Sequence, residues 1–420
     1  MIILMSGGLT IATGAVIFLL ITLILVGALL FAKAKLIPSG NVKMVVNDES
    51  EYDVALGGTV LNTLQAQGIF LSSACGGSGS CGQCRCRIPE GGGNILPTEV
   101  GFFSRKQIKS HWRLGCQTKI KEDLRILVPE EVFGVKEWEC TVVSNHNVAS
   151  FIKEFTVRLP EGEKMDFKPG SYAQIKIPAY DLNFTDFAVD ERFKSEWDKF
   201  KMWNLACRND EPTIRAYSMA NYPAEGNIIT LNVRIATPPF DRSAGTWTAG
   251  VKPGIGSSFI FNLKPGDKVM MSGPYGDFHI LDTKREMLYI GGGAGMAPLR
   301  AHLLHLFKTL KTTDRQVSYW YGARSKAEIF YEEDFRAIER DFPNFKFNIA
   351  LSEPRPEDNW TGYVGFIHQV IHDRYLKDHE APEDIEYYMC GPGPMAKAVE
   401  GMLDNLGVPR DMLHFDDFGA

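Results

Sequence analysis

An uninterrupted apolar run lies near the start of the chain. Leu9 to Ala32 carry no charged side chain, and the first charges after them are Lys33 and Lys35. A helix of this run, at about 1.5 Å per residue, exceeds the roughly 30 Å hydrocarbon core of a bilayer. The run predicts a transmembrane helix whose C-terminal side is cytoplasmic, because basic residues follow it. A cleaved signal peptide is the alternative, but it would begin with basic residues and have a shorter apolar core.

Strand-like and helix-like patterns follow over residues 40–130. Four stretches have the composition of β-strands, at 42–46, 51–56, 86–88 and 124–128. Thr59 to Gly68 has apolar residues at helical spacing, which predicts a helix with Thr59 as N-cap and Gly68 as C-cap. This block therefore predicts a sheet of hairpins crossed by one helix.

The next block, residues 137–283, predicts an antiparallel β-structure. Its expected strands lie at 139–146, 151–158, 171–177, 213–219, 227–235 and 268–272. Six short strands separated by turns are typical of an antiparallel barrel. A polar and aromatic insertion at about 180–210 interrupts them, either to contact a partner or to cap the barrel.

From residue 284 the pattern alternates between strands and helices. We expect strands at 287–290, 316–321, 345–351 and 387–389, and helices at 299–311, at 332–340, near 363–375 and from Pro394. Such alternation predicts a doubly wound parallel sheet.

Composition narrows the range of functions. The chain has 420 residues, of which 45% are hydrophobic and 23% charged, so we expect about three folded domains. Its formal net charge of −6 gives no support to nucleic-acid binding. Four of the eight cysteines, Cys86, Cys140, Cys207 and Cys390, have no evident pairing, which favours a reducing compartment over a disulfide framework.

The other four cysteines indicate a metal centre. Cys75, Cys81 and Cys84 lie in a loop rich in glycine and serine, and Cys116 follows after a longer gap. Four thiolates from one tight loop and one distant position suit a [2Fe–2S] cluster, and small residues allow backbone N–H groups to approach the cluster sulfurs. Zinc is the alternative, but zinc sites usually use two C-x2-C pairs. Cys86 is expected to point to the opposite side of a strand.

Two further loops have the chemistry of phosphate binding. Gly291 to Pro298 is a strand-to-helix turn that contains Gly292, Gly293 and Gly295, although Pro298 departs from the G-x-G-x-x-G pattern. Gly256, Ser257 and Ser258 open a short apolar segment whose free N–H groups would suit a diphosphate. A tight turn without ligand is the alternative for the first loop.

These patterns resemble two known families. Residues 40–130 resemble plant-type ferredoxins of the β-grasp fold, and Arg215-Ala-Tyr217-Ser218 resembles the flavin-binding signature of the ferredoxin–NADP reductase superfamily. The second resemblance implies that Arg215 binds the flavin pyrophosphate, Tyr217 lies against the isoalloxazine and Ser218 lies near its N5. It also favours FAD over FMN from the Gly256–Ser258 element.

The resemblance extends to the remaining cofactor positions. Asn232 and Arg234 match the strand that lines the other side of the flavin, and Cys390-Gly391 matches the element beside the nicotinamide ring. Ser218 and Cys390 are thus the expected catalytic residues. The aromatic side chain of Phe418 is expected to cover the flavin, with a frayed tail as the alternative. The run around Arg324 resembles the NADH-using branch more than the NADPH-using one.

The order of segments predicts a multidomain protein: a membrane helix (1–35), a [2Fe–2S] β-grasp domain (36–130), an FAD barrel (131–283) and an α/β doubly wound NADH domain (284–420). This order resembles the F subunits of the bacterial Na+-translocating NADH:quinone reductases. It implies a single-pass protein of the bacterial inner membrane that passes electrons from NADH, through FAD and the cluster, to partner subunits and indirectly to quinone. An oxygenase reductase and a membrane-tethered redox sensor are the alternatives.

Overall fold

The computed structural model describes residues 13–28, 40–73, 75–241 and 243–416. Residues 13–28 are helical and exposed, and the rest of the expected membrane span, at 9–12 and 29–32, lies outside the described residues. None of the helices in the described part of the chain is both long enough and apolar enough to span a bilayer. The chain divides into two compact units: Met1–Leu71 with Gly82–Glu130, and Ser72–Cys81 with Glu131–Ala420.

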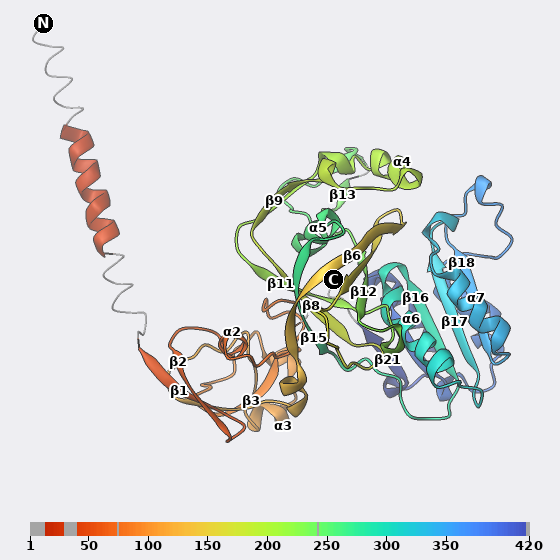
Figure 1. The fold of residues 1–420 in the computed structure, drawn as a ribbon, viewed down its shortest axis with the longest axis horizontal. Coiled ribbons are helices and arrows are strands. Elements are labelled where there is room, and N and C mark those ends of the chain that lie inside the picture. Colours follow the sequence, from red (N-terminus) through yellow and green to blue (C-terminus); the bar gives the residue numbers. More distant parts are fainter. Residues whose placement is uncertain (1–12, 29–39, 74, 242, 417–420) are drawn as a thin grey trace, which may run out of the picture. The chain divides into compact units, whose positions relative to one another are not determined.

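The first unit contains a five-stranded sheet with the strand order β2-β1-β5-β3-β4. Its strands are β1 (Asn41–Val46), β2 (Ser50–Ala55), β3 (Arg85–Glu90), β4 (Trp112–Leu114) and β5 (Leu124–Leu127). Figure 1 labels three of these strands, β1, β2 and β3. β1 pairs antiparallel with β2 and parallel with β5. The predicted sheet with one crossing helix is therefore confirmed, and a short second helix, α3 (Arg105–Lys109), precedes β4.

Helix α2 (Val60–Ala66) forms where its N-cap and its apolar positions predict it. The Thr59 hydroxyl accepts a hydrogen bond from the Asn62 N–H at 3.3 Å, and Val60, Leu61 and Leu64 are buried. The expected C-cap is wrong, because Gln67 caps the helix and Gly68 follows it with a φ of +78°. Glycine suits this position after a helix because it adopts positive φ without steric cost.

A buried ion pair fixes the strand that leads to Cys116. Glu99 and Arg113 are 0% and 4% exposed, and Arg113 Nη2 lies 2.8 Å from Glu99 Oε2. Glu99 also accepts hydrogen bonds from the backbone N–H groups of Leu114, at 2.7 Å, and Leu96, at 2.9 Å. One carboxylate therefore holds both β4 and the preceding loop in place.

The second unit contains two large sheets. The first is antiparallel, with the order β11-β8-β15-β6-β7-β12, and consists of β6 (Lys136–Ala149), β7 (Ile152–Arg158), β8 (Tyr172–Ile177), β11 (Thr213–Ser218), β12 (Ile228–Arg234) and β15 (Lys268–Tyr275). All six predicted strands are confirmed. An isolated antiparallel bridge between Met219 and Leu231 links the segment after β11 to β12. Helix α5 (Ile255–Asn262) and a short hairpin of β13 (Phe240–Asp241) and β14 (Thr246–Trp247) precede β15.

The insertion consists of β9 (Tyr180–Asn183), α4 (Glu191–Lys199) and β10 (Ala206–Asn209), with β9 and β10 paired antiparallel. Phe193 and Trp197 on α4 are buried, and Trp197 belongs to the same hydrophobic core as the antiparallel sheet. The Trp197 Nε1–H donates to the Ser150 carbonyl oxygen at 2.7 Å. The insertion therefore caps this sheet, one of the two alternatives left by the sequence.

The second large sheet is parallel, with the order β19-β18-β17-β16-β20-β21. Its strands are β16 (Met287–Gly292), β17 (Val317–Ala323), β18 (Phe345–Leu351), β19 (Tyr363–Val364), β20 (Glu386–Cys390) and β21 (Leu413–Asp416). Its helices are α6 (Met296–Leu304), α7 (Glu332–Asp341), α8 (Ile367–Arg374) and α9 (Gly393–Asn405). The predicted doubly wound sheet is confirmed, but β19 and β21 were not expected. The first helix was expected too late, because α6 begins at Met296 and a π-turn continues it over His305–Thr309.

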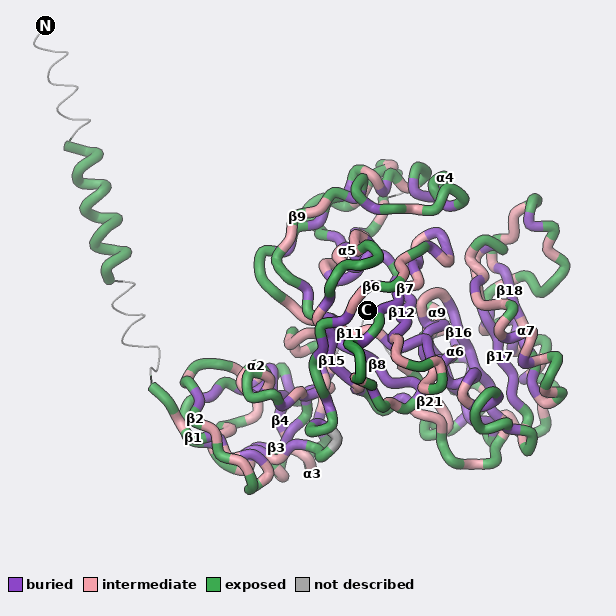
Figure 2. The backbone as a smooth tube through the Cα atoms, in the orientation of Figure 1, coloured by how far each residue is buried: buried purple, intermediate pink, exposed green. Residues whose placement is uncertain are grey.

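The central strands of this sheet are largely buried (Figure 2): β16 is buried throughout, and β17 is buried from Val317 to Tyr321. Such strands read as continuous apolar runs because helices cover both faces of a parallel sheet. β16 lies between β17 and β20, so the strand order reverses beside it. Ligands of open parallel sheets bind outside the carboxyl ends of the strands at this switch point.

Candidate functional site

The predicted flavin residues of β11 lie beside the start of α5. Arg215 pairs with Ile175, and Tyr217 pairs with Ala173 on β8. A Cβ atom on Gly256 would lie 2.5 Å from Tyr217 Oη and 2.9 Å from Arg215 Cγ, so only glycine fits here. Burial raises the pKa of Tyr217, which keeps the phenol neutral. The structure thus brings together two motifs that are separate in the sequence.

The serines at the start of α5 have different surroundings. The Ser257 hydroxyl accepts from the Ala236 N–H at 3.0 Å and donates to the Gly254 carbonyl oxygen at 3.1 Å. Ser258 is fully buried, and its N–H donates to the Gly254 carbonyl oxygen. The Ser257 side chain is therefore already used by the backbone, and Gly256 lets the start of α5 pack closely against Tyr217 and Arg215.

Strand β12 presents a polar group and a cation at its end. Asn232 is buried, and its Nδ2 donates to Tyr331 Oη at 2.8 Å. The Asn232 Oδ1 is also buried and has no hydrogen-bond partner in the described structure, so it is available to a bound group. Arg234 is exposed at the end of the strand. These positions fit the predicted second wall of the flavin site.

The two expected catalytic residues meet at a third residue. The Ser218 hydroxyl on β11 donates to Asp416 Oδ2 at 2.5 Å, and the Cys390 thiol on β20 donates to the Asp416 backbone carbonyl at 3.5 Å. Ser218 belongs to the antiparallel sheet and Cys390 to the parallel sheet, so Asp416 on β21 connects the two halves of the site. Asp416 was not among the expected site residues, because its role depends on the tertiary pairing of β21 with β20.

The glycine loop of the parallel sheet lies against the Cys390 segment. A Cβ atom on Gly295 would lie 2.1 Å from the Cys390 carbonyl oxygen, and a Cβ atom on Gly391 would lie 3.2 Å from Gly292 N. Gly293 adopts a φ of +57°, and Pro298 lies in the first turn of α6, where a missing N–H is tolerated. This is the switch point between β16 and β20. The absence of side chains there allows the glycine loop to pack against the backbone of Cys390 and Gly391. The helix that follows the loop offers its N-terminus to a phosphate.

The four predicted cluster ligands form two pairs. Cys75 Sγ and Cys81 Sγ are 3.3 Å apart, and the hydrogen bond from Cys81 lowers the pKa of the Cys75 thiol to about 2. In the other unit the Cys116 N–H donates to Cys84 Sγ at 3.4 Å, and the side chain of Cys116, together with burial, raises the pKa of Cys84. Backbone N–H groups directed at cysteine sulfurs are characteristic of iron–sulfur sites, and the Cys116 N–H is directed at Cys84 Sγ in this way.

No group of three or more Cys, His, Asp or Glu among the residues described is arranged to hold a metal ion. All eight cysteines are free of disulfide bonds. Cys86 is fully buried and its thiol faces the Arg113 carbonyl oxygen at 4.0 Å, as expected for a residue that is not a ligand. Burial raises its pKa to about 12.

The cysteine loop from Ser72 to Cys81 belongs to the same compact unit as the flavin strands. Gln174 on β8 donates through Nε2 to the Ser73 carbonyl oxygen at 3.3 Å. A Cβ atom on Gly76 would lie 2.3 Å from the Ile214 carbonyl oxygen and 2.7 Å from Arg215 Nη1. The loop that carries Cys75 therefore packs directly on the strand of the flavin signature.

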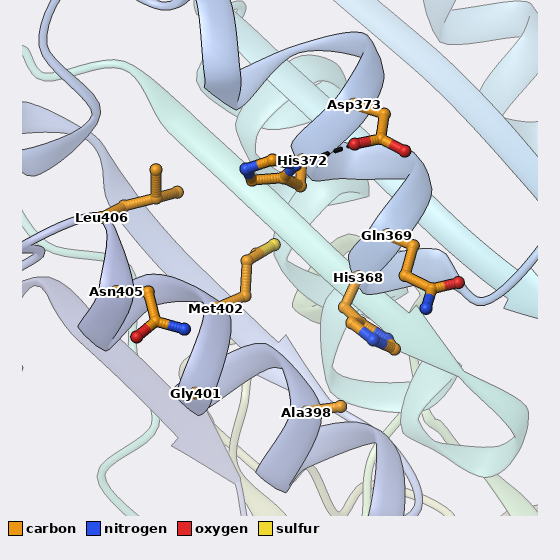
Figure 3. Close-up of a pocket in the computed structure, with 9 residues that line it drawn as sticks. All are labelled: His368, Gln369, His372, Asp373, Ala398, Gly401, Met402, Asn405 and Leu406. Carbon is orange, nitrogen blue, oxygen red and sulfur yellow. Dashed lines mark hydrogen bonds and ion pairs between the residues drawn. The ribbon is translucent and has the colours of Figure 1, made fainter.

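A pocket of about 520 Å³ lies elsewhere, between α8 and α9 (Figure 3). It is lined by His368, Gln369, His372, Asp373, Ala398, Gly401, Met402, Asn405 and Leu406. None of these residues belongs to the predicted flavin, nicotinamide or cluster sites. Phe418, the remaining predicted site residue, lies outside the described part of the chain.

Comparisons with known proteins agree with this arrangement. Three families match the chain: the 2Fe-2S iron-sulfur cluster binding domain at residues 44–121, the oxidoreductase FAD-binding domain at 198–280 and the oxidoreductase NAD-binding domain at 289–401. The F subunit of the Na(+)-translocating NADH-quinone reductase of Pseudomonas aeruginosa is 52% identical over 403 residues, which cover 96% of this chain and 97% of that protein. The chain belongs to this F-subunit family.

Other relatives in the family are equally similar. The F subunit of Klebsiella pneumoniae is 52% identical over 409 residues, 97% of this chain and 99% of its own length. Among solved structures, the ferredoxin reductase in carbazole 1,9a-dioxygenase is 25% identical, with a TM-score of 0.56, over 91% of this chain and 99% of that one. The Amycolatopsis cytochrome P450 reductase GcoB is 22% identical and shares the fold, with a TM-score of 0.61 over 90% and 98%. The F-subunit family member described here therefore has the [2Fe–2S], FAD and NAD domains of this reductase class.

Proposed function

We propose that the chain is the NADH-oxidising subunit of a Na+-translocating NADH:quinone oxidoreductase. Membership of the F-subunit family supports this role, since the relatives that match over nearly their whole length carry this name. FAD accepts a hydride from NADH, and a [2Fe–2S] cluster passes electrons singly to membrane partners. Quinone reduction and Na+ transport belong to the assembled complex.

The observation that carries the proposal is the contact of Ser218 and Cys390 with Asp416. Ser218 comes from the flavin signature and Cys390 from the nicotinamide element, so the two rings would meet here. With its proton directed at Asp416 Oδ2, the Ser218 hydroxyl would offer a lone pair to the flavin beside N5, and Asp416 would orient that hydroxyl. Cys390 would pack against the nicotinamide and help to exclude water, since it is only 1% exposed.

The binding roles follow from the positions of the other residues. Arg215 would hold the flavin pyrophosphate, Tyr217 would stack on the isoalloxazine, and Asn232 Oδ1 would accept a hydrogen bond from it. Gly256 to Ser258 would receive the diphosphate at the start of α5, and Arg234 would line the outer edge. The NADH site would be shaped by Gly292, Gly293, Gly295, Pro298 and Gly391. Phe418 would cover the flavin.

Cys75, Cys81, Cys84 and Cys116 would bind the cluster. The contact of Gly76 with the strand that carries Arg215 supports a short path for electrons from the flavin to the cysteine loop. The proposal also places the domain boundaries at 1–35, 36–130, 131–283 and 284–420. It closes the antiparallel sheet into a barrel.

We also propose that the apolar run Leu9–Ala32 anchors the chain in the bacterial inner membrane, with the remaining residues on the cytoplasmic side. Its charge-free length and the lysines that follow it support this placement. The anchor would keep the cluster close to partner subunits. An oxygenase reductase, the role named for one structural relative, would have no need of such an anchor.

The test uses the full-length chain purified in detergent. NADH should bleach the flavin absorbance and produce the EPR signal of a reduced [2Fe–2S] cluster. Cys84→Ala should remove the EPR signal and leave flavin bleaching, whereas an undiminished EPR signal would contradict the ligand assignment. Membranes that contain the chain should show Na+-dependent quinone reduction, and dependence on a hydroxylase instead would overturn the proposed complex.

A further inference from the structure

A charged cluster lies at the carboxyl ends of β17 and β18. Arg324 directly follows β17, and Arg355 lies four residues beyond the end of β18. Asp358 ties the two loops together, because its Oδ2 accepts from the Lys326 N–H at 3.1 Å and from the Arg355 N–H at 2.9 Å. Two guanidinium groups are therefore held on the edge of the sheet where parallel sheets bind nucleotides.

A carboxylate from the insertion enters this cluster. Glu196 on α4 pairs through Oε1 with Arg355 Nη2 at 2.5 Å, although 159 residues separate the two in the chain. Its Oε2 lies 3.9 Å from Arg324 Nη2. The side chain is only 8% exposed, and no group among the described residues forms a hydrogen bond with Oε2. Glu196 thus presents a buried, partly unsatisfied carboxylate oxygen to the cation pair.

The position of Glu196 is set by the packing of its helix. Its neighbour Trp197 is fully buried and donates to the Ser150 carbonyl oxygen. The Ser150 hydroxyl donates in turn to Glu328 Oε1 at 2.5 Å, and Glu328 Oε1 lies 3.3 Å from Arg324 Nη2. Two carboxylates therefore face two guanidinium groups, and the Lys199 ammonium lies 3.8 Å from Glu196 Oε1.

This arrangement matters for the choice of dinucleotide. In dinucleotide-binding sheets an acidic residue near the end of the second strand accepts the 2′-hydroxyl of the adenosine ribose, whereas an arginine there accommodates a 2′-phosphate. In this chain the second strand after the glycine loop is β17, and the residue that follows it is Arg324. The parallel sheet by itself therefore supplies Arg324, a cation that suits a 2′-phosphate.

We propose that Glu196 is a specificity-determining residue that excludes NADPH by occupying the cation pair and accepting the ribose 2′-hydroxyl of NADH. The inference rests on the proposed function and assigns the choice of NADH to the insertion of the FAD domain. A 2′-phosphate would have to displace Glu196 from Arg355 and would meet its negative charge. A ribose hydroxyl can instead donate to the unsatisfied Oε2.

The test compares kcat/KM for NADPH and NADH in the FAD-loaded full-length chain, with ferricyanide as acceptor. Glu196→Gln removes the charge but keeps the shape, and we expect the NADPH-to-NADH ratio to rise at least about tenfold, equivalent to about 1.4 kcal/mol. Adenosine 2′,5′-bisphosphate should inhibit this variant more strongly than the wild type. Glu196→Asp retains the charge and should keep the wild-type ratio.

Glu191→Gln is the matched control, since Glu191 lies on the same helix with its side chain 87% exposed. This variant should change neither the NADPH-to-NADH ratio of kcat/KM nor the inhibition by adenosine 2′,5′-bisphosphate. An unchanged ratio in Glu196→Gln, or an equal fall for both dinucleotides, would overturn the inference, because either result would mean that Glu196 only supports the fold. A wild type that oxidises neither dinucleotide would instead refute the proposed function.

Discussion

Removal of the Glu99 carboxylate should destabilise the cluster-binding unit while the flavin site survives. In Glu99→Ala the guanidinium of Arg113, which is 4% exposed, keeps only carbonyl oxygens such as that of Gly93, at 3.2 Å. Breaking a buried ion pair by removing one partner costs about 3–5 kcal/mol. A domain is stable by only about 5–15 kcal/mol, so about a fifth of its stability or more would be lost.

The assay follows the visible absorbance of the cluster during heating of the full-length chain. In Glu99→Ala the cluster should be lost at a lower temperature than in the wild type, and NADH should still bleach the flavin below that temperature. Glu122→Ala, at an exposed position of the same unit, serves as control and should match the wild type.

The Glu99–Arg113 ion pair can also be tested with a double variant. Because desolvation of two charges offsets much of their attraction, replacing both by apolar residues of similar volume is often neutral. Glu99→Leu combined with Arg113→Met should therefore regain much of the stability lost in Glu99→Ala. A double variant no more stable than Glu99→Ala would refute this account of the ion pair. So would a loss of less than about 1 kcal/mol in Glu99→Ala.

Three further predictions concern the second unit. Asp416→Ala should slow flavin reduction by NADH by about 10- to 100-fold in stopped-flow measurements, because a hydrogen bond from Ser218 to a charged group is worth about 1.5–3 kcal/mol; a rate within twofold of wild type would contradict its positioning role. Gly295→Ala should abolish reduction by NADH while FAD stays bound, because the new Cβ would lie 2.1 Å from a carbonyl oxygen, whereas Gly401→Ala, which meets no atom within 4 Å, should be silent. Burial lowers the pKa of His302 to about 3, so below about pH 6.5 the unfolded chain binds a proton that the folded chain does not. The free energy of unfolding should therefore fall by about 1.4 kcal/mol per unit as the pH is lowered from about 6 to 4. Tm measured over this pH range should depend less steeply on pH in His302→Gln than in the wild type.

Local patterns predicted the elements well, because the signals for them are local. The strands of both large sheets follow from apolar runs between turns, and Thr59 caps α2 as its hydroxyl predicts. The glycine-rich loop before Pro298 predicts a strand-to-helix turn for the same reason. Short elements without a periodic pattern, such as β19 and β21, were missed since pairing with a neighbour defines them.

The residues that complete the sites could not be found in this way. Asp416 matters only because β21 pairs with β20, and Glu196 only because the insertion folds back towards Arg355. Within its own segment, each is an acidic residue at a position where the local pattern predicts only exposure to solvent. A charge whose partner lies more than 150 residues away leaves no trace in a single sequence.

The hydrogen bond between Ser218 and Asp416 spans 198 residues, and this separation has a consequence for biosynthesis. At about 5–20 residues per second, a ribosome needs roughly 10–40 s to extend the chain from one partner to the other. Once β15 (Lys268–Tyr275) has been made, the antiparallel sheet around Arg215 has all its strands, whereas the parallel sheet is still untranslated. A nascent chain that binds FAD at this stage therefore holds a flavin that NADH cannot yet reduce, because the NADH site has not been made.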